Sequence, residues 1–420
     1  HLSVHSFPTR RSSDLIAEST YPNLMPYPTG DAEGIVSTFQ TAQTPYDWQV
    51  ENFTRPANED LVIYELLVRD FVAAHDYQTL IDTINYLKNL GVNAIELMPV
   101  SEFEGNSSWG YNPSFYFAPD KYYGTKDDLK AFIDVCHQNG IAVILDMVLN
   151  HSYGQSPFVQ LYFDPSAGEY GQPTPENPWY NETSPNPTYY WGFDFDHESP
   201  QTKEFVNRVT TYWLDEYKFD GFRFDFTKGF TNTPGEGWSY DQSRIDILKD
   251  MADTIWNAAP GAYVILEHLT ENSEEKVLAE YGMLLWGNMN YSYLEASMGY
   301  ITNSDFSFIS YKNRSWNAPH LVGYMESHDE ERMMYKNITY GNNTAVYDIT
   351  QEEIALRRAE LSTLFFLTVP GPKMIWQFGE MGYDYSIDYD CRVCEKPIRW
   401  DYLEEDGRRH LYNFYSQVID

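Results

Sequence analysis

The sequence lacks several features that mark other classes of protein. It has no apolar run of about 18 residues, which excludes a membrane-spanning helix. It has neither a P-loop nor a dinucleotide fingerprint, so we expect no organic cofactor. Basic residues are also scarce, with 28 Lys and Arg against 62 Asp and Glu, a net charge of −34. A surface this acidic repels nucleic acid and anionic membranes and suits a neutral substrate.

Cysteine is the next scarce residue, with three in the chain. Cys136 falls in a helical pattern and is predicted to be a small buried apolar side chain. Cys391 and Cys394 form a C-x-x-C pair without a second pair, so a zinc site is not indicated. The sequence leaves two interpretations open for this pair, a local disulfide or two free thiols.

The N-terminal region gives little guidance on the fold. Residues 5–15 resemble one reading frame of a sequencing-library adapter, the alternative being a natural basic, Ser-rich tail. We therefore set residues 1–15 aside as an expected artefact. Residues 16–58 are rich in Pro, Thr, Asn and Gly, which predicts a linker or the tail of a missing upstream module. No initiator Met or signal peptide is seen, and we expect the true N-terminus to be missing.

The region 59–420 alternates short β-rich runs with helical runs, which predicts an α/β protein with a parallel sheet. Eight such units predict a closed (β/α)8 barrel that carries catalysis at the C-terminal ends of its strands. Residues 151–200, rich in Pro, Asn, Tyr and Gly, interrupt the pattern after the third strand and predict an inserted loop subdomain above the active face. The predicted strands are 61–67, 93–97, 141–146, 220–224, 262–266, 283–286, 321–324 and 373–376. The predicted helices are 77–90, 125–139, 201–217, 243–257, about 351–367 and about 408–419.

Acidic residues and histidines stand at the ends of four of these strands. Asp225 ends the fourth strand, and Arg223 shares its face two residues earlier, so we expect the arginine to keep Asp225 ionised. A structural Arg–Asp pair is the alternative for this segment alone. Glu267 follows the apolar fifth strand, and Asp329 follows the seventh. One such end could be structural, but four at one rim indicate an active site.

Three carboxylates and two histidines at one rim favour glycoside chemistry. Breaking an acetal needs an acid for the leaving oxygen and a carboxylate to meet the positive charge that develops on the sugar. Asp225 is the candidate nucleophile and Glu267 the candidate acid, which must keep its proton near neutral pH. A separation of about 5–5.5 Å between them would give retention through a covalent glycosyl-enzyme.

From about Leu61 to its end, the chain resembles the α-amylase family of glycoside hydrolases. The resemblance rests on four motifs in order, namely Asp146-Met-Val-Leu-Asn-His151, Gly221-Phe-Arg-Phe-Asp225, Glu267 and His328-Asp329. It implies Asp225 as nucleophile, Glu267 as general acid/base and Asp329 as the carboxylate that binds sugar hydroxyls and stabilises the transition state.

The resemblance also implies roles for the neighbouring residues. Arg223 would orient Asp225, His151 and His328 would bond the sugar at the cleavage site, and Asp146 would be a structural acid. The motif at 109–113 is similar to the family's loop after the second strand and makes Tyr111 a stacking platform, with packing as the alternative.

Three further assignments follow from the resemblance. Lys228 would contact the leaving-group side, the alternative being a solvated loop charge. Asn150 and Asp194 would bind Ca²⁺, although two residues do not supply the six to eight oxygens that calcium takes. His268 has no counterpart in the family and is expected to be structural.

The resemblance leaves the reaction open. Our first hypothesis is an endo-acting hydrolase of α-1,4 bonds in starch, glycogen or maltooligosaccharides. The string from Ser327 to Glu330 is similar to glycogen branching enzymes, so a branching or other transglycosylating enzyme is the alternative. A non-catalytic carbohydrate-binding relative is the third hypothesis, against which the intact carboxylates argue. The acidic net charge favours a secreted, periplasmic or cell-surface location.

Overall fold

The computed structural model describes residues 14–15, 37–38, 44–105, 107–120 and 122–420. Residues 5–13 of the adapter-like segment and most of the region 16–43 lie outside the described residues, so the predictions for them stay predictions. Two short strands, β1 (Asp14–Leu15) and β2 (Ser37–Thr38), pair antiparallel. Among the described residues, no helix combines the length and the apolar character needed to cross a bilayer.

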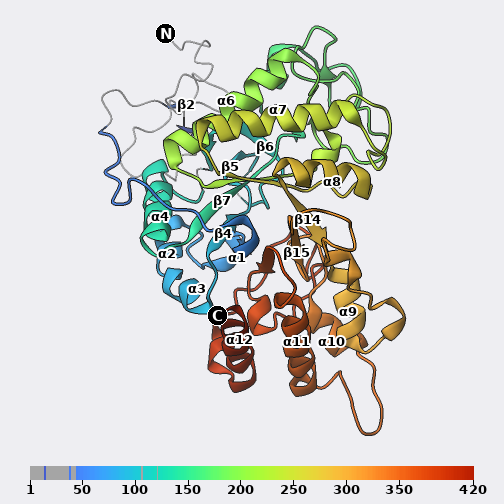
Figure 1. The fold of residues 1–420 in the computed structure, drawn as a ribbon. Coiled ribbons are helices and arrows are strands. Elements are labelled where there is room, and N and C mark those ends of the chain that lie inside the picture. The colour runs from blue at the N-terminus through green and yellow to red at the C-terminus, as the bar shows by residue number, and fades with distance from the viewer. Residues whose placement is uncertain (1–13, 16–36, 39–43, 106, 121) are drawn as a thin grey trace.

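Eight parallel strands close into a barrel, as the sequence predicts (Figure 1). Each pairs with its neighbours in chain order, and the last pairs with the first, with Lys373 opposite Val62. The strands are β3 (Val62–Leu66), β4 (Ala94–Leu97), β7 (Ala142–Met147), β12 (Gly221–Phe224), β13 (Tyr263–Leu266), β14 (Leu284–Asn288), β15 (Leu321–Tyr324) and β16 (Lys373–Trp376).

Helices surround the strands, and the long ones lie within two residues of their predicted bounds. The predicted helix over 77–90 is instead two helices, broken where the Thr83 hydroxyl donates to the Leu80 carbonyl and competes with the helical hydrogen bonds. The helices are α1 (Val68–Phe71), α2 (Tyr77–Ile81), α3 (Ile84–Leu90), α4 (Lys126–Gln138), α6 (Pro200–Tyr217), α7 (Gln242–Ala258), α8 (Asn272–Tyr281), α9 (Asn290–Met298), α10 (Met333–Tyr340), α11 (Glu352–Leu367) and α12 (Asp406–Ile419).

The interior of the barrel changes character along the strands. Alternate side chains of a strand point inwards, and those in the lower part of the barrel form an apolar cluster that includes Ile63, Ala94, Ile144 and Ile265. Two residues further along, towards the C-terminal ends, the inward positions are charged and fully buried. These positions hold Glu65, Glu96, Asp146 and Arg223. The strand alternation therefore carries a charged layer to the C-terminal mouth of the barrel.

The insertion at 151–200 has a small packed interior. Strand β8 (His151–Ser152) pairs antiparallel with β11 (Phe193–Asp194) and closes the insertion at its base. Phe158 and Phe195 are buried and pack against Phe205 of α6. The insertion also contains α5 (Pro157–Leu161), β9 (Phe163–Asp164) and β10 (Gln172–Pro173), and the loop after β4 contains β5 (Ser101–Phe103) and β6 (Pro113–Pro119).

The cysteines resolve the two interpretations of the C-x-x-C pair. Cys391 and Cys394 form a disulfide in the loop after β16. Cys136 is a free thiol, buried on α4 as predicted.

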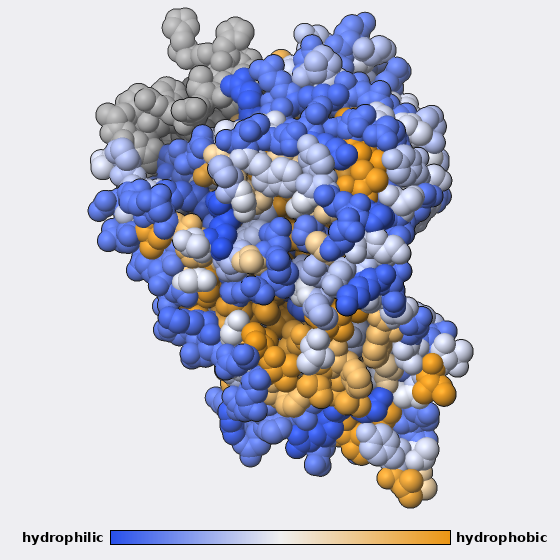
Figure 2. Space-filling model, in the orientation of Figure 1, coloured by the Kyte–Doolittle hydropathy of each residue, from blue (hydrophilic) through white to orange (hydrophobic). Residues whose placement is uncertain are grey.

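The surface has an apolar patch on α11. This helix exposes Leu361, Leu364 and Phe365, and the patch lies in the lower half of the view in Figure 2.

Candidate active site

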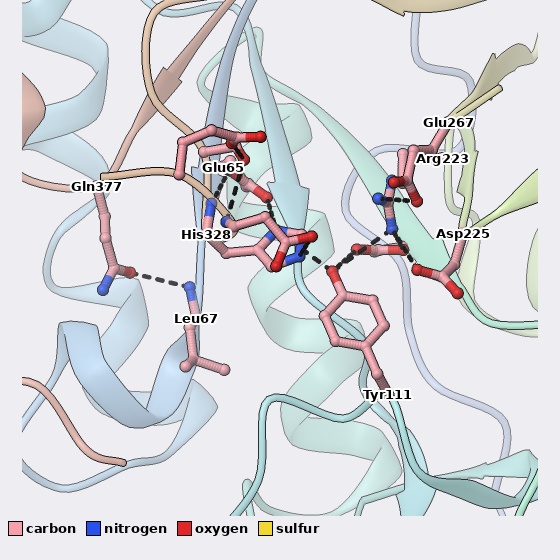
Figure 3. A network of polar contacts seen from close by, with 12 residues as sticks. Glu65, Leu67, Tyr111, Arg223, Asp225, Glu267, His328 and Gln377 are labelled. Atoms are coloured by element: carbon pink, nitrogen blue, oxygen red, sulfur yellow. Dashed lines mark hydrogen bonds and ion pairs between the residues drawn. The ribbon is translucent and has the colours of Figure 1, made fainter. Parts of the chain in front are cut away.

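Arg223 is the centre of the charged layer at the mouth of the barrel. Its side chain is fully buried, and its guanidinium lies 4.0 Å from the ring centre of Trp286. One nitrogen, Nη1, donates to Asp146 at 2.8 Å and to Asp225 at 3.3 Å, and Nη2 donates to Glu267 at 2.8 Å. One guanidinium therefore holds three carboxylates from three neighbouring strands (Figure 3).

Asp225 and Glu267 share this arginine unequally. Glu267 Oε2 accepts both from Arg223 and from the Phe226 amide at 2.9 Å. Burial raises the pKa of Asp225 well above its ordinary value, the negative charge on Glu267 raises it further, and Arg223 opposes both effects. The net shift is therefore upward, opposite to the lowering expected from Arg223 alone.

Tyr111 links this group to the opposite side of the mouth. Its hydroxyl donates to Asp146 at 2.5 Å and lies 3.4 Å from His328 Nδ1. Its ring stacks on the His328 ring with 4.9 Å between centres. Figure 3 shows the hydroxyl between His328 on one side and Arg223 with Asp225 on the other. The tyrosine is thus fixed by hydrogen bonds, and its role as a platform for sugar stays a prediction.

His328 is held by Glu65 of the first barrel strand. Its Nδ1 lies 2.6 Å from Glu65 Oε1, and its backbone amide donates to Glu65 Oε2 at 3.1 Å. Its Nε2 lies 3.5 Å from Asp329. Burial opposes the charged form, but the charges on Asp329 and Glu65 prevail and raise the pKa of His328 to about 9. The imidazolium therefore persists at neutral pH beside Asp329.

Asp329 lies at the open edge of the site. Burial works to raise its pKa, but His328 and Arg392 outweigh it and the pKa is lowered, so Asp329 is an anion at neutral pH. Arg392 Nη2 donates to Asp329 Oδ1 at 3.0 Å and to the Asp329 carbonyl at 2.6 Å. The third predicted carboxylate therefore has a partner from the loop after the eighth strand.

His151 and Lys228 are both buried, and other residues of the protein surround them. His151 is buried, its Nε2 lies 2.9 Å from the Tyr111 carbonyl, and burial lowers its pKa to about 4. Lys228 is also buried, with its ammonium 3.4 Å from the ring centre of Trp238 and 5.0 Å from that of Tyr189. Lys228 is thus packed among aromatic rings, and the alternative of a solvated loop charge is wrong.

Asn150 and Asp194, the predicted calcium ligands, line one small cavity of about 10 Å³. The side-chain oxygen of Asn150 is buried without a hydrogen-bond partner, which suits a cation-binding position. Asp194 accepts from Asn181 at 2.8 Å and from Ser184 at 3.1 Å. No cluster of three or more His, Cys, Asp or Glu side chains in the described residues could hold a metal. A small cation fits here only if neutral oxygens complete its shell.

His268 is structural, as expected. It is fully buried, Nδ1 lies 3.0 Å from the Thr227 hydroxyl, and Nε2 lies 2.8 Å from Glu274. Glu274 in turn receives two hydrogen bonds from Arg244, at 2.7 Å and 2.8 Å. Arg244 also donates to the Lys228 carbonyl at 2.7 Å, so this network supports the loop after β12.

Comparison with known proteins agrees with this geometry. The model of the alpha-amylase catalytic domain matches residues 51–191. This part of the chain is therefore similar to the catalytic domain of the α-amylase family. The chain is 30% identical to a malto-oligosyltrehalose trehalohydrolase of Saccharolobus solfataricus, over 53% of this chain and 36% of the relative. It is 27% identical to a 1,4-alpha-glucan branching enzyme of Aliivibrio fischeri, over 83% of this chain and 50% of the relative.

A solved structure shows the same fold. Pullulanase type I from Bacillus subtilis, determined in complex with maltose, superposes with a TM-score of 0.65 at 21% identity, over 92% of this chain and 60% of the pullulanase. The predicted (β/α)8 barrel is therefore confirmed. The chain spans only about a third to a half of the length of the two curated relatives it matches.

Two residues of the site do not follow from the sequence motifs. Glu65 binds His328 from 263 positions away, and Arg392 binds Asp329 from 63 positions away. A charged residue inside the first buried strand was the available signal for Glu65. For Arg392 the sequence offers only its place inside the C-x-x-C pair. The structure brings Arg223, Asp225, Glu267, Asp146, Tyr111, His328 and Asp329 together at the mouth.

Proposed function

We propose that the protein is a retaining α-glucan-active enzyme that hydrolyses α-1,4-glucosidic bonds of starch, glycogen or maltooligosaccharides. The observation that carries the proposal is the grouping of Asp225 and Glu267 on one arginine, with Asp329 across the mouth beside a charged histidine. A carboxylate nucleophile and a carboxylic acid are what glycoside cleavage with retention requires, and the resemblance to the α-amylase family adds Asp329 as the third carboxylate. The similarity of residues 51–191 to the alpha-amylase catalytic domain supports the same chemistry.

In this proposal Asp225 attacks the anomeric carbon while Glu267 protonates the leaving oxygen. Glu267 then takes a proton from water, and the water oxygen attacks the anomeric carbon, which breaks its bond to Asp225 and frees the sugar. In the sugar-free arrangement Glu267 accepts hydrogen bonds from Arg223 and from the Phe226 amide, while burial and the charge of Glu267 raise the pKa of Asp225. The reaction needs a proton on Glu267 and a negative charge on Asp225, next to Arg223. Asp329 and the His328 imidazolium would bind sugar hydroxyls.

A branching or other transglycosylating enzyme is the second candidate, because it uses the same first half-reaction. The similarity to a branching enzyme over 83% of this chain supports this second candidate. Incubation with amylose separates the two, with reducing ends and iodine staining followed together. We expect new reducing ends with rapid loss of staining. Loss of staining without new reducing ends would instead establish chain transfer.

The third candidate, a binding protein without catalysis, is disfavoured by the complete set of carboxylates. It would be supported if amylose changed in neither assay but the protein was retained on an amylose column.

We further propose that Asn150 and Asp194 take part in a calcium site that ties the insertion to the barrel. The buried, unpartnered oxygen of Asn150 supports this proposal. A bound Ca²⁺ would supply structural cross-linking, not a step of the reaction. We expect a chelator to lower the melting temperature and added Ca²⁺ to restore it. The calcium site would be ruled out if the wild type had the same melting temperature with chelator and with Ca²⁺, and if the Asn150→Ala variant melted at that temperature too.

A further inference from the structure

The disulfide loop after the eighth strand reaches the catalytic mouth. The loop Cys391–Cys394 contains Arg392, and the guanidinium of Arg392 contacts Asp329 at both its carboxylate and its backbone carbonyl. The contact lies at the surface, since the side chains of Arg392 and Asp329 expose 50% and 42%. Exposed ion pairs are weak unless their partners are already held in place. The position of Arg392 therefore depends on what fixes its backbone.

Two buried cations and one covalent bond fix that backbone. Lys396 Nζ lies within hydrogen-bond reach of four loop carbonyls, those of Tyr389, Cys391, Arg392 and Cys394, at 2.6–3.3 Å. Arg69 donates to the carbonyls of Val393 and Cys394, each at 3.1 Å. The disulfide between Cys391 and Cys394 closes the loop covalently.

Arg69 also joins the loop to the first barrel strand. It forms two hydrogen bonds with Asp70 at 2.8 Å and 2.9 Å, and both residues are buried on α1, directly after β3. The strand β3 carries Glu65, the partner of His328. The loop and the histidine next to Asp329 are thus held by the same end of the barrel.

We propose that the Cys391–Cys394 disulfide holds Arg392 against Asp329, so that Arg392 is a positioning residue for the third carboxylate and the redox state of the loop controls the site. The proposal rests on the function proposed above for Asp329. Nothing else in the described residues donates a hydrogen bond to the Asp329 carboxylate, whose other close neighbour is His328 at 3.5 Å. Without Arg392 in place, one of the two charges that fix this carboxylate is lost.

Reduction of the loop is a balanced exchange with a dithiol. The Cys391–Cys394 bond takes up two electrons and two protons and becomes two thiols. The reagent, dithiothreitol, gives up the same electrons and protons and becomes a cyclic disulfide. The reduced loop keeps its hydrogen bonds to Lys396 and Arg69, but the backbone at Arg392 becomes more mobile. The weak ion pair between Arg392 and Asp329 is therefore the contact that is lost.

The kinetic test compares substitutions at the loop on the complete chain with amylose as substrate. We expect Arg392→Gln to lower kcat about ten-fold with little change in KM, because a charge-assisted hydrogen bond to a catalytic group is lost. Arg392→Lys should restore part of kcat, and the double variant Cys391→Ser, Cys394→Ser should resemble Arg392→Gln. Arg409, a surface arginine paired with Asp406, offers the matched control, and Arg409→Gln should leave kcat unchanged.

The redox test uses the wild type. Dithiothreitol should lower kcat by the same factor and expose two thiols to a thiol reagent, and Cys136→Ser should respond identically because its thiol is buried. The double serine variant should not respond. Unchanged kcat in the double variant or in reduced wild type would overturn the redox control, and unchanged kcat in Arg392→Gln would overturn the positioning role.

A measurement that needs no activity separates this inference from the proposed function. Hydrogen exchange of the backbone should quicken at 389–396 and also at 327–331 in the double serine variant, because Arg392 binds the Asp329 carbonyl. Faster exchange confined to 389–396, or no change, would contradict the coupling. If wild type left amylose unchanged, the function proposed above would fail, while the exchange experiment would still decide the coupling.

Discussion

Two buried networks of arginine, carboxylate and histidine stand beside each other at the end of the barrel, and they differ in charge balance. In the supporting network, one guanidinium, Arg244, is paired with one carboxylate, Glu274, and His268 completes it. The pKa of Glu274 is lowered, since burial, which raises it, is outweighed by the hydrogen bonds from His268 and Arg244. Every charge there has a partner, which is what a structural network needs.

The network at the mouth has one guanidinium for three carboxylates. Arg223 cannot neutralise Asp146, Asp225 and Glu267 together, so the pKa of Asp225 is raised by burial and by the charge of Glu267. Uncompensated negative charge is unfavourable for folding, and it is retained where it serves the chemistry. The two networks are alike in burial and in residue types. They differ in the number of carboxylates that each guanidinium must balance.

The largest effect should follow the removal of Asp225 from the unbalanced network. Asp225→Asn removes the proposed nucleophile and should lower kcat on amylose by roughly 10⁴-fold. The stability of the folded protein, in contrast, should not fall in this variant. With a folded-state pKa above the ordinary 3.8, Asp225 makes folding less favourable as the pH rises beyond that value. At pH 7 the amide avoids this loss, so the melting temperature should hold or rise.

These two measurements together test the comparison. If Asp225→Asn lost activity and also lowered the melting temperature, the carboxylate would be structural, as in the balanced network. If activity were unchanged, the proposed mechanism would be wrong. Asp225→Ala should give the same loss of activity, but the smaller side chain leaves a cavity, so Asp225→Asn is the cleaner test of stability.

The next largest effect should come from breaking the balanced network. Glu274→Gln leaves the Arg244 guanidinium buried without a counter-charge, which should reduce the free energy of unfolding by about 4 kcal/mol. Urea unfolding at pH 7 measures this loss. Glu280→Gln on the same helix is the control, since the exposed pair of Glu280 with Lys276 contributes under about 1 kcal/mol. Equal losses in both variants would remove the distinction between buried and exposed pairs.

The sequence predicted most of the fold because the barrel rests on local patterns. Short apolar runs such as 262–266 gave the strands within one or two residues, since inward and outward positions are both buried in a parallel barrel. The break at Thr83 was missed because it depends on one hydroxyl bond that competes with the helix. The strand-end motifs likewise gave the residues of the mouth.

What escaped prediction are the contacts between strands far apart in sequence. Glu65 reaches His328 because β3 and β15 flank β16 in the closed barrel, an outcome of ring closure and not of spacing. Arg223 faces Glu267 as well as Asp225 because β12 and β13 pair in register. The direction of the Asp225 pKa shift depends on that geometry, so a motif with an arginine two residues away predicted it wrongly.

The smallest effect is a pH dependence that contrasts the two histidines. His328 has a folded-state pKa of about 9 against an ordinary 6.5, so its contribution to stability is fully present below pH 6.5 and is lost as the pH rises through 9. The stability difference between wild type and His328→Gln should therefore shrink between pH 6.5 and 9, by at most about 3 kcal/mol. Urea unfolding at several pH values measures it.

His268 supplies the opposite sign within the same experiment. Burial lowers its pKa despite the hydrogen bond to Glu274, so its contribution to stability is present above pH 6.5 and is lost as the pH falls below that value. Between pH 6.5 and 9 the difference between wild type and His268→Gln should stay level. Two curves that fell together would mean that both histidines carry charge in the folded protein, and the charge balance that separates the two networks would not hold.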